Sequence, residues 1–361
     1  IHRISDANQA SRYCFCPRTN MQHILDPDTQ LLDAWLTQQR LPIFRAAQIR
    51  RWIYASQAES FADMTNLPLK LREELARHFQ WWTTQTASHQ KAEDGTEKLL
   101  LELADGKKIE CVLLRDGERR TICISTQVGC AMGCVFCASG LDGVDRNLTS
   151  GEIVEQMLRL GRLLPADERL SHIVVMGMGE PLANLGNLMP ALAIASQQQG
   201  LGISPRRITI STVGLPAAMQ RLADAAVSYN LAVSLHAAND ALRNKLVPVN
   251  TKSGLSPILT AADAYFEASG RRLTYEYVLL GGINDRREDA LQLAGLLRGR
   301  PALLNLIPYN PVSGLPYKTP AAETVETFSS LLTERGINIQ VRRLKGSRID
   351  AACGQLRRTK A

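Results

Sequence analysis

The chain has 361 residues, of which 45% are hydrophobic and 21% charged, and its formal net charge at neutral pH is +7. This composition is that of a globular protein with room for one large and one smaller domain, and it excludes a disordered or fibrous chain. No apolar run approaches the roughly 20 residues of a membrane-spanning helix, and residues 1–20 lack the apolar stretch of a secretory signal, so we expect a cytoplasmic protein without a membrane partner.

A small helical accessory domain is predicted over residues 21–90, after a leader at 1–20 that we expect to be disordered. Within this domain, apolar side chains recur at helical spacing over 43–54, and Pro68 precedes a second helical pattern over 69–79, where a proline is tolerated in the first turn. A packing subdomain is the simpler interpretation of these helices. An RNA-contacting module is the alternative, because basic side chains lie opposite the apolar ones, namely Arg45, Arg50 and Arg51.

Two Asp-Gly turns indicate a β-hairpin linker region over 91–118, which leads into the main domain at 119–341. There, strand and helix patterns alternate, and one helix pattern begins at a capping box formed by Thr149 and Glu152. Six short apolar strands are predicted, at 121–126, 172–178, 207–212, 231–235, 273–279 and 303–307. Because repeated strand–helix units build parallel sheets, the predicted fold class is α/β, a partial (βα)6 TIM-like barrel with a small N-terminal helical domain. The chemistry of such a barrel lies at the C-terminal ends of its strands.

Cys130, Cys134 and Cys137, three of the eight cysteines, follow the first barrel strand on a predicted loop. A large chain of this kind keeps its cysteines for metals or catalysis rather than for disulfides. Iron–sulfur cubanes are held by cysteine thiolates, normally four, so three close cysteines would leave one iron open to a substrate or cofactor. Structural zinc needs four protein ligands, usually in two close pairs, and no second pair follows. The spacing therefore favours a [4Fe–4S] cluster over zinc.

Polar residues recur where the next predicted strands end. The second strand ends in a Gly-x-Gly sequence followed by Glu180, but Leu182 takes the place of the third glycine of a dinucleotide-binding loop, so that interpretation is weak. Each polar residue alone would be an ordinary strand-end cap. Their recurrence at successive strand ends indicates a binding site, and the residues are Ser211, the run Ser234, Leu235 and His236, and Asn310.

Two lone cysteines and a basic segment complete the features of interest. Cys353 lies among small residues near the C-terminus, as suits a mobile loop whose thiol must reach a site, and Cys123 lies in the first barrel strand. Taken singly, each would be a buried, inert cysteine. The segment 342–361 carries seven basic residues against one acid, Asp350, which fits either a contact with a phosphate backbone or a solvated tail.

Five motifs in this order resemble those of the RlmN/Cfr family of radical S-adenosylmethionine (SAM) RNA methyl synthases, and the RlmN branch is the closer of the two. The resemblance spans about 42–356, and the motifs lie at 122–130, 175–182, 233–237, 305–311 and 349–356.

The resemblance implies a role for each residue singled out above. Cys130, Cys134 and Cys137 would ligate the [4Fe–4S] cluster. Cys353 would receive a methyl group from one SAM molecule, and a radical made from a second SAM would activate that methyl for addition to an adenine carbon. Glu110 would accept the proton of that carbon, and Cys123 would free the product by forming a disulfide with Cys353. SAM would be contacted by Gly179, Glu180, Ser211, Ser234, Leu235, His236 and Asn310.

The implied substrates are an adenosine of 23S ribosomal RNA near the peptidyl transferase centre and, for RlmN, the adenosine just 3′ of a tRNA anticodon. The RlmN branch favours methylation at C2, with C8 as the alternative. An electron donor such as flavodoxin or ferredoxin and a monomeric enzyme are expected. Asp142 and Asp145, just after the cluster motif, are unexpected beside RNA and leave the exact substrate open.

Two competing hypotheses remain. A methylthiotransferase would need a second cluster, for which Cys14, Cys16 and Cys111 are poorly spaced. A non-catalytic iron–sulfur RNA-binding protein would leave Cys123 and Cys353 without a role.

Overall fold

The computed structural model describes residues 21–26, 29–56, 58–342 and 345–357. The leader at 1–20, with Cys14 and Cys16, lies outside the described residues. So do three basic residues of the C-terminal segment, Arg343, Arg358 and Lys360.

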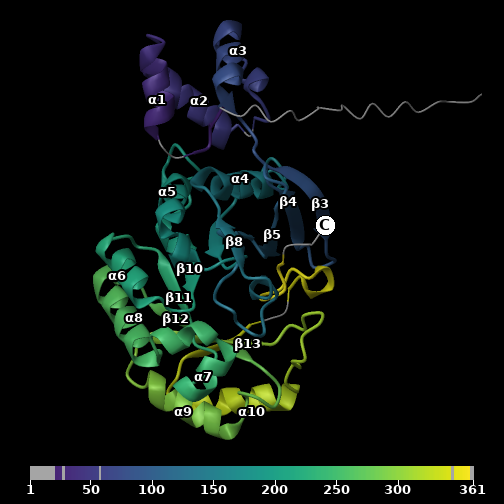
Figure 1. Ribbon diagram of the computed structural model, residues 1–361, viewed down its shortest axis with the longest axis vertical. Coiled ribbons are helices and arrows are strands. Elements are labelled where there is room, and N and C mark those ends of the chain that lie inside the picture. The colour runs from purple at the N-terminus through teal and green to yellow at the C-terminus, as the bar shows by residue number, and fades with distance from the viewer. Residues whose placement is uncertain (1–20, 27–28, 57, 343–344, 358–361) are drawn as a thin grey trace, which may run out of the picture.

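Three helices form a tier at one end of the molecule (Figure 1): α1 (Thr29–Gln38), α2 (Phe44–Tyr54) and α3 (Leu69–His78). Helices α2 and α3 confirm the two that helical spacing predicts. Two short strands, β1 (Gln22–His23) and β2 (Phe79–Gln80), pair in parallel and so bring the two ends of this region together.

Ten strands form the central sheet, in the order β14-β13-β12-β11-β10-β9-β6-β5-β4-β3. Neighbouring strands are parallel from β6 to β14 and antiparallel from β6 to β3. The strands are β3 (Gln85–Lys91), β4 (Glu97–Glu102), β5 (Lys108–Asp116), β6 (Arg119–Cys123), β9 (His172–Val175), β10 (Ile208–Thr212), β11 (Asn230–Ser234), β12 (Leu273–Leu279), β13 (Ala302–Pro308) and β14 (Ile339–Val341).

Helices that connect the parallel strands pack on the outer side of the curved sheet (Figure 1). The first of them begins at the predicted capping box, where Glu152 N donates to Thr149 Oγ1 (3.1 Å) and Thr149 N donates to Glu152 Oε2 (2.9 Å). The helices are α4 (Ser150–Gly161), α5 (Leu185–Ser196), α6 (Pro216–Asp224), α7 (Asp240–Leu246), α8 (Leu255–Ser269), α9 (Arg287–Leu297) and α10 (Ala322–Thr333). No helix among the described residues is long and apolar enough to cross a membrane.

All six predicted parallel strands are confirmed, as β6, β9, β10, β11, β12 and β13, and with them the partial-barrel fold class. The hairpin predicted over 91–118 exists as β4 and β5, and it extends the main sheet. Strand β3 is mostly exposed and polar and β14 has only three residues, so neither leaves the apolar run from which a strand is predicted. A separate antiparallel pair, β7 (Gln127–Gly129) and β8 (Val144–Asn147), was also not predicted.

Side chains alternate between the two faces of each strand, so residues that are neighbours in register share a face. Ser234 of β11 lies opposite Glu276 of β12, and Cys123 of β6 lies opposite Val174 of β9. The register thus places polar and sulfur-bearing side chains of different strands on one face of the parallel sheet.

Candidate active site

A cavity of about 900 Å³, counting its part open to solvent, lies where the parallel strands end. Small-molecule sites measure roughly 300–1,000 Å³, so this cavity could hold a cofactor. Leu235 does not line the cavity, because its side chain is fully buried, and only its backbone N–H donates to the carbonyl of Glu276 at 2.9 Å. The predicted residues that do line it are Cys130, Cys134, Cys137, Gly179, Glu180, Ser211, Ser234, His236, Asn310 and Cys353.

Backbone contacts hold the loop that carries the three clustered cysteines. Cys130 N donates to Gly143 O at 2.8 Å, and Val135 N donates to Leu246 O at 3.1 Å. Gly129, which ends β7, has φ +78°, and a Cβ at this position would lie 2.1 Å from Gly143 O. Only glycine therefore allows the loop to leave β7 in this direction.

The three thiols fit a [4Fe–4S] cluster with one open iron. They come from one loop and line one cavity, and in a cubane each thiolate binds its own iron, so the thiols need not converge on one point. In the part of the chain that the structure describes, no three His, Cys, Asp or Glu side chains are placed to hold a single metal ion. Burial raises the pKa of all three thiols, that of Cys130 to about 12. Bound iron would oppose this effect, because positive charge favours thiolates.

The Gly-x-Gly sequence after β9 is required by close packing beside the cavity. A Cβ on Gly177 would lie 2.6 Å from Ser125 Oγ. Gly179 has φ +99°, and its Cβ would lie 2.6 Å from Gln127 Cβ. The glycines therefore shape this wall of the cavity through contacts with the protein itself, which the motif alone did not reveal.

Glu180 is buried at the edge of the same wall, and its backbone N–H donates to Gln127 Oε1 at 2.8 Å. One carboxylate oxygen accepts from Leu182 N and the other from Val213 N, both at 3.0 Å. Burial raises the pKa of Glu180, and these hydrogen bonds oppose the shift. The carboxylate is thus held rigidly on the cavity wall, where it could accept a hydrogen bond from an ammonium group.

His236 follows β11 in a left-handed conformation, with φ +59°. Its Nδ1 accepts a hydrogen bond from Val278 N at 3.1 Å, so the neutral ring carries its proton on Nε2. Burial and the charge of Arg243 lower the pKa of His236 to about 3. The ring packs edge-on against Phe136, with the ring centres 4.9 Å apart. A neutral imidazole that donates through Nε2 therefore lines the cavity beside the cysteine loop.

Arg243, which the sequence did not single out, fixes two strand ends below this ring. Its fully buried guanidinium donates to the carbonyls of Leu235 (2.9 Å), Ser234 (2.7 Å) and Val213 (2.5 Å), and also to Asn250 Oδ1. Burial lowers the pKa of Arg243 to about 10. The predicted layer of strand-end residues therefore depends on an arginine in the middle of α7.

A second cavity, of about 680 Å³, lies on the other side of the Cys353 segment and is lined by Cys123, Cys353 and Arg342. The two cavities share four lining residues: Met176, Ile307, Asn310 and Cys353. Burial raises the pKa of Cys123 to about 12, and the neighbouring Cys353 adds to this shift. The pKa of Cys353 is raised by burial and lowered by the charge of Arg342. The structure thus brings together two cysteines that are 230 residues apart in sequence, and both thiols are free.

The Cys353 segment is docked against the cluster loop and the end of β13. Gly354 O accepts from Ala138 N (2.8 Å), and Cys353 O accepts from Asn310 Nδ2 (3.1 Å). Asn310 is buried, and its Oδ1 has no hydrogen-bond partner. Asn310 therefore touches the segment as well as the first cavity, and it keeps one acceptor available there.

Glu110 lies in β5 and is buried, but it lines neither of these two cavities. Its carboxylate forms an ion pair with Lys98 and accepts from Arg357 N. The structure thus places the predicted proton acceptor under the C-terminal segment. Glu276 was not predicted at all, although it lines the first cavity, accepts from Ser211 Oγ at 3.1 Å and lies 4.0 Å from Arg342. A single carboxylate within an apolar strand gives no spacing signal.

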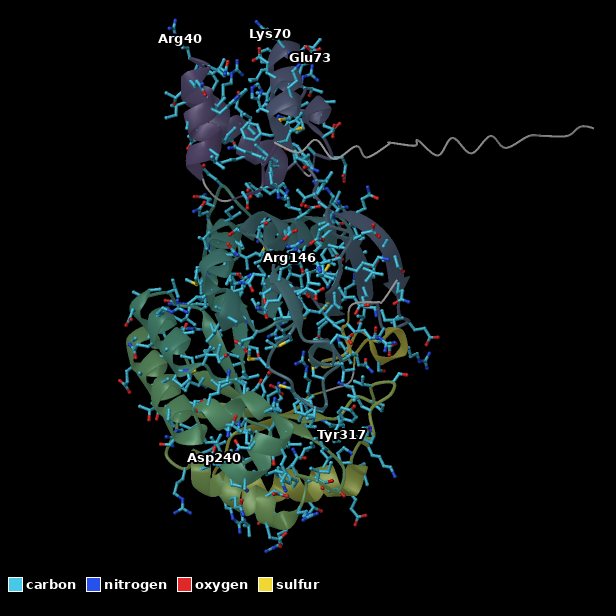
Figure 2. The ribbon with its side chains drawn as sticks, viewed as in Figure 1. Arg40, Lys70, Glu73, Arg146, Asp240 and Tyr317 are labelled. Atoms are coloured by element: carbon cyan, nitrogen blue, oxygen red, sulfur yellow. The ribbon has the colours of Figure 1, made fainter. Side chains whose placement is uncertain are left out.

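Several charged residues considered for RNA contact are already engaged within the protein. Arg50 forms an ion pair with Asp33 at 2.8 Å, and Asp145 forms one with Lys107 at 2.9 Å. Arg146, which Figure 2 labels beside the barrel, binds both oxygens of Glu152 and one of Asp105. The acid at 145 therefore does not present an unpaired negative charge to RNA.

Comparison with known proteins identifies the family. Residues 124–294 match the model of the radical SAM superfamily, and residues 22–80 match that of the ribosomal RNA large subunit methyltransferase N-terminal domain. A probable dual-specificity RNA methyltransferase RlmN of Rhodopirellula baltica is 62% identical over 344 residues, which cover 95% of this chain and 92% of that one. The chain belongs to the RlmN family.

Two further relatives agree with this membership. The probable dual-specificity RNA methyltransferase RlmN of Bacillus subtilis is 43% identical to the chain over 94% of both proteins. The crystal structure of a radical SAM methyltransferase from Sphaerobacter thermophilus matches with a TM-score of 0.90 and 41% identity, covering 93% of this chain and 99% of that one. The predicted family, fold class and enzyme class are thereby confirmed for this RlmN-family chain.

Proposed function

We propose that this RlmN-family enzyme methylates C2 of an adenosine in 23S ribosomal RNA and in tRNA, with the methyl group carried on Cys353. The observation that carries the proposal is the position of Cys353, which lines the cavity of the three clustered cysteines on one side and the cavity of Cys123 on the other. The RlmN relatives, named as dual-specificity RNA methyltransferases, support RNA as the substrate. C2 rather than C8 rests on the resemblance to the RlmN branch.

The first cavity would hold the [4Fe–4S] cluster on Cys130, Cys134 and Cys137, with SAM between the cluster and the strand ends. When bound, the cluster and SAM would supply the electron and the radical that activates the methyl group, with one further SAM consumed as methyl donor and flavodoxin or ferredoxin as electron donor. Glu180 would accept from the ammonium of SAM, since its carboxylate is fixed on the cavity wall. His236 would donate to SAM through Nε2, because its Nδ1 is already bonded to the backbone.

The two lone cysteines would act in sequence. The Cys353 sulfur takes a methyl group by displacement, and the activated carbon then bonds to the adenine, so that protein and RNA are joined through Cys353. Glu110 takes the proton from the adenine carbon. The Cys123 sulfur then attacks the Cys353 sulfur, a disulfide forms and the RNA is released. The shared cavity supports this last step, because thiol–disulfide exchange requires the two sulfurs to meet.

Replacing each cysteine separately tests the proposal. Cys353→Ala should assemble the cluster and yet form no methylated RNA. Cys123→Ala should still join Cys353 to RNA and, having no thiol to release it, should accumulate a covalent protein–RNA species on a denaturing gel after anaerobic turnover. Cys111→Ala is the matched control, since Cys111 is fully buried in β5 and lines neither cavity.

Full methylation by Cys353→Ala would refute the methyl-carrier role. Mass analysis of nucleosides from the methylated RNA separates C2 from C8 methylation, and the use of ribosomal RNA and tRNA as separate substrates tests the dual specificity. A non-catalytic iron–sulfur RNA-binding protein would bind RNA without cleaving SAM in the presence of a reductant.

A further inference from the structure

The surroundings of Glu110 contain a second buried charge. Lys98 of β4 places its Nζ 2.8 Å from Glu110 Oε1, and the two side chains are only 7% and 8% exposed. The backbone of Glu110 is fixed from the other side, because its carbonyl accepts from Ser125 Oγ at 2.6 Å. Lys98 is thus bound to the residue proposed as proton acceptor, on a strand that neighbours it in the sheet.

The two oxygens of Glu110 are held by different kinds of partner. Oε1 is bound by Lys98, which belongs to the same rigid sheet, whereas Oε2 accepts from the backbone N–H of Arg357 at 2.9 Å. Lys98 Nζ also donates to the carbonyl of Asp350 at 3.2 Å. Both Asp350 and Arg357 belong to the segment that carries Cys353. The Lys98–Glu110 pair is therefore a point at which that segment touches the β4–β5 hairpin.

Stability alone is a poor reason for this pair. A buried ion pair is often no more stabilising than an apolar pair of the same size, because the loss of hydration offsets the attraction. The other ion pairs of β4 and β5 are more exposed or lie on the opposite face. Lys108 is 3.7 Å from a Glu102 that is 45% exposed, and Glu97, which points to the other face, binds Arg115 at 2.5 Å.

A proton acceptor must come within roughly 2.6–3.2 Å of the atom that carries the proton. With the segment docked, the Arg357 N–H occupies Oε2, so this oxygen can receive a substrate proton only after residue 357 has moved away. Oε1 does not depend on that movement. A base whose one oxygen stays fixed while the other is released needs a permanent partner on the sheet.

We propose that Lys98 is the positioning residue of Glu110: it keeps Oε1 in place while Oε2 exchanges the Arg357 N–H for the proton of the adenine carbon. This inference rests on the proposed function. Glu110 Oε2 forms the new O–H bond, the carbon–hydrogen bond breaks, and its electron pair stays with the adenine. Lys98 itself neither gains nor loses a proton in this step.

Anaerobic turnover of the complete enzyme with RNA tests the proposal in three variants. Lys98→Met removes the ammonium and keeps most of the stem, Lys98→Arg keeps a cation and its donors, and Glu110→Gln removes the base. Lys108→Met is the matched control, because it removes an ion pair of the same hairpin that is exposed. For each variant we measure 5′-deoxyadenosine formation, methylation of Cys353, the covalent protein–RNA species and methylated RNA.

Lys98→Met should lower methylated RNA by on the order of tenfold to a hundredfold, part of the 10²–10⁴-fold that a general base contributes. Cys353 methylation and 5′-deoxyadenosine formation should stay within about twofold of the parent enzyme, so the covalent species should accumulate, as in Glu110→Gln. Lys98→Arg should restore most of the product, and Lys108→Met should behave like the parent. A variant that merely loosened the fold would lose all four readouts together.

Two results separate the inference from the function on which it rests. Normal product from Lys98→Met, alongside an inactive Glu110→Gln, would overturn the role of Lys98 alone. Full methylation by Glu110→Gln would instead remove Glu110 as the base, and the proposed function would need another proton acceptor. If Lys98→Met fails to fold because it strands a buried carboxylate, Lys98→Gln keeps an N–H donor to Oε1 and is expected to show the same accumulation.

Discussion

The wall of the SAM cavity offers a direct test of the packing argument, through Gly179→Ala. Two effects combine at this position. The backbone has φ +99°, a conformation that L side chains rarely adopt, and the new Cβ would lie 2.6 Å from Gln127 Cβ and 2.8 Å from Gln127 N. Neither neighbour is the free end of a flexible side chain, so the backbone itself must move.

Two other glycines separate these effects. Gly106, at the tip of the β4–β5 hairpin, has φ +77°, and a Cβ added there would have no atom within 4 Å, so Gly106→Ala introduces only backbone strain. Gly177→Ala introduces only the close approach, 2.6 Å from Ser125 Oγ and 2.7 Å from Ile124 O. Left-handed backbone costs an L residue about 1–2 kcal/mol, and overpacking costs about 1–3 kcal/mol. Gly179→Ala should therefore lower the free energy of unfolding by about 2–5 kcal/mol, the sum of the two effects.

The assay is urea unfolding of the anaerobic enzyme, together with SAM binding by each variant. Gly106→Ala should lose about 1–2 kcal/mol and bind SAM normally, because the hairpin tip does not line the cavity. Gly179→Ala should lose more stability and also bind SAM more weakly, since Gln127 accepts from the Glu180 backbone through Oε1. If Gly179→Ala cost no more than Gly106→Ala, the close approach to Gln127 would have no energetic weight and the reasoning would be refuted.

Three further predictions concern the metal, the RNA and the pH dependence. Anaerobically prepared enzyme should contain an oxygen-sensitive [4Fe–4S] cluster that Cys134→Ala loses, and one equivalent of zinc without iron would contradict this. Neutralising Arg357 and Arg358 together should reduce the salt dependence of RNA binding by a slope of about 0.7–0.9 for each phosphate that these side chains neutralise, whereas an unchanged slope would indicate a solvated tail. The pKa of His236 is lowered from 6.5 to about 3 by burial and Arg243, so the unfolded chain binds the proton more readily. Stability should thus be complete above pH 6.5 and fall as the pH drops towards 3, and His236→Gln should flatten that part of a pH-dependent unfolding curve.

The sequence predicted the barrel well because each parallel strand is an apolar run that alternates with helix patterns. Strand β14 and strand β3 were missed for the converse reason, since they are short or exposed and their pairing depends on the rest of the sheet. The cluster loop was found from local spacing alone. Arg243 and Glu276 were not found, because their importance arises from carbonyls and side chains of other strands that only the folded sheet brings near.

The pairing of Cys123 with Cys353 illustrates the same limit. Nothing local in the sequence joins two cysteines 230 residues apart, and the resemblance to a family was the only ground for linking them. The structure supplies the physical connection, since the Cys353 segment is bound to Ala138 beside the cluster loop, to Asn310 after β13 and to Glu110 in β5.

These three contacts also explain how one thiol could serve two partners. Cys353 lies at the boundary between the two cavities, so a small displacement of its segment changes which cavity the sulfur faces. The contacts that hold it are mostly hydrogen bonds to its backbone, each worth only about 1 kcal/mol net, and they can be exchanged without unfolding the barrel. The charged pair of Lys98 and Glu110, by contrast, stays on the sheet. A mobile thiol between fixed partners is the arrangement that a methyl carrier requires, because the sulfur must meet SAM, the adenine and Cys123 in turn.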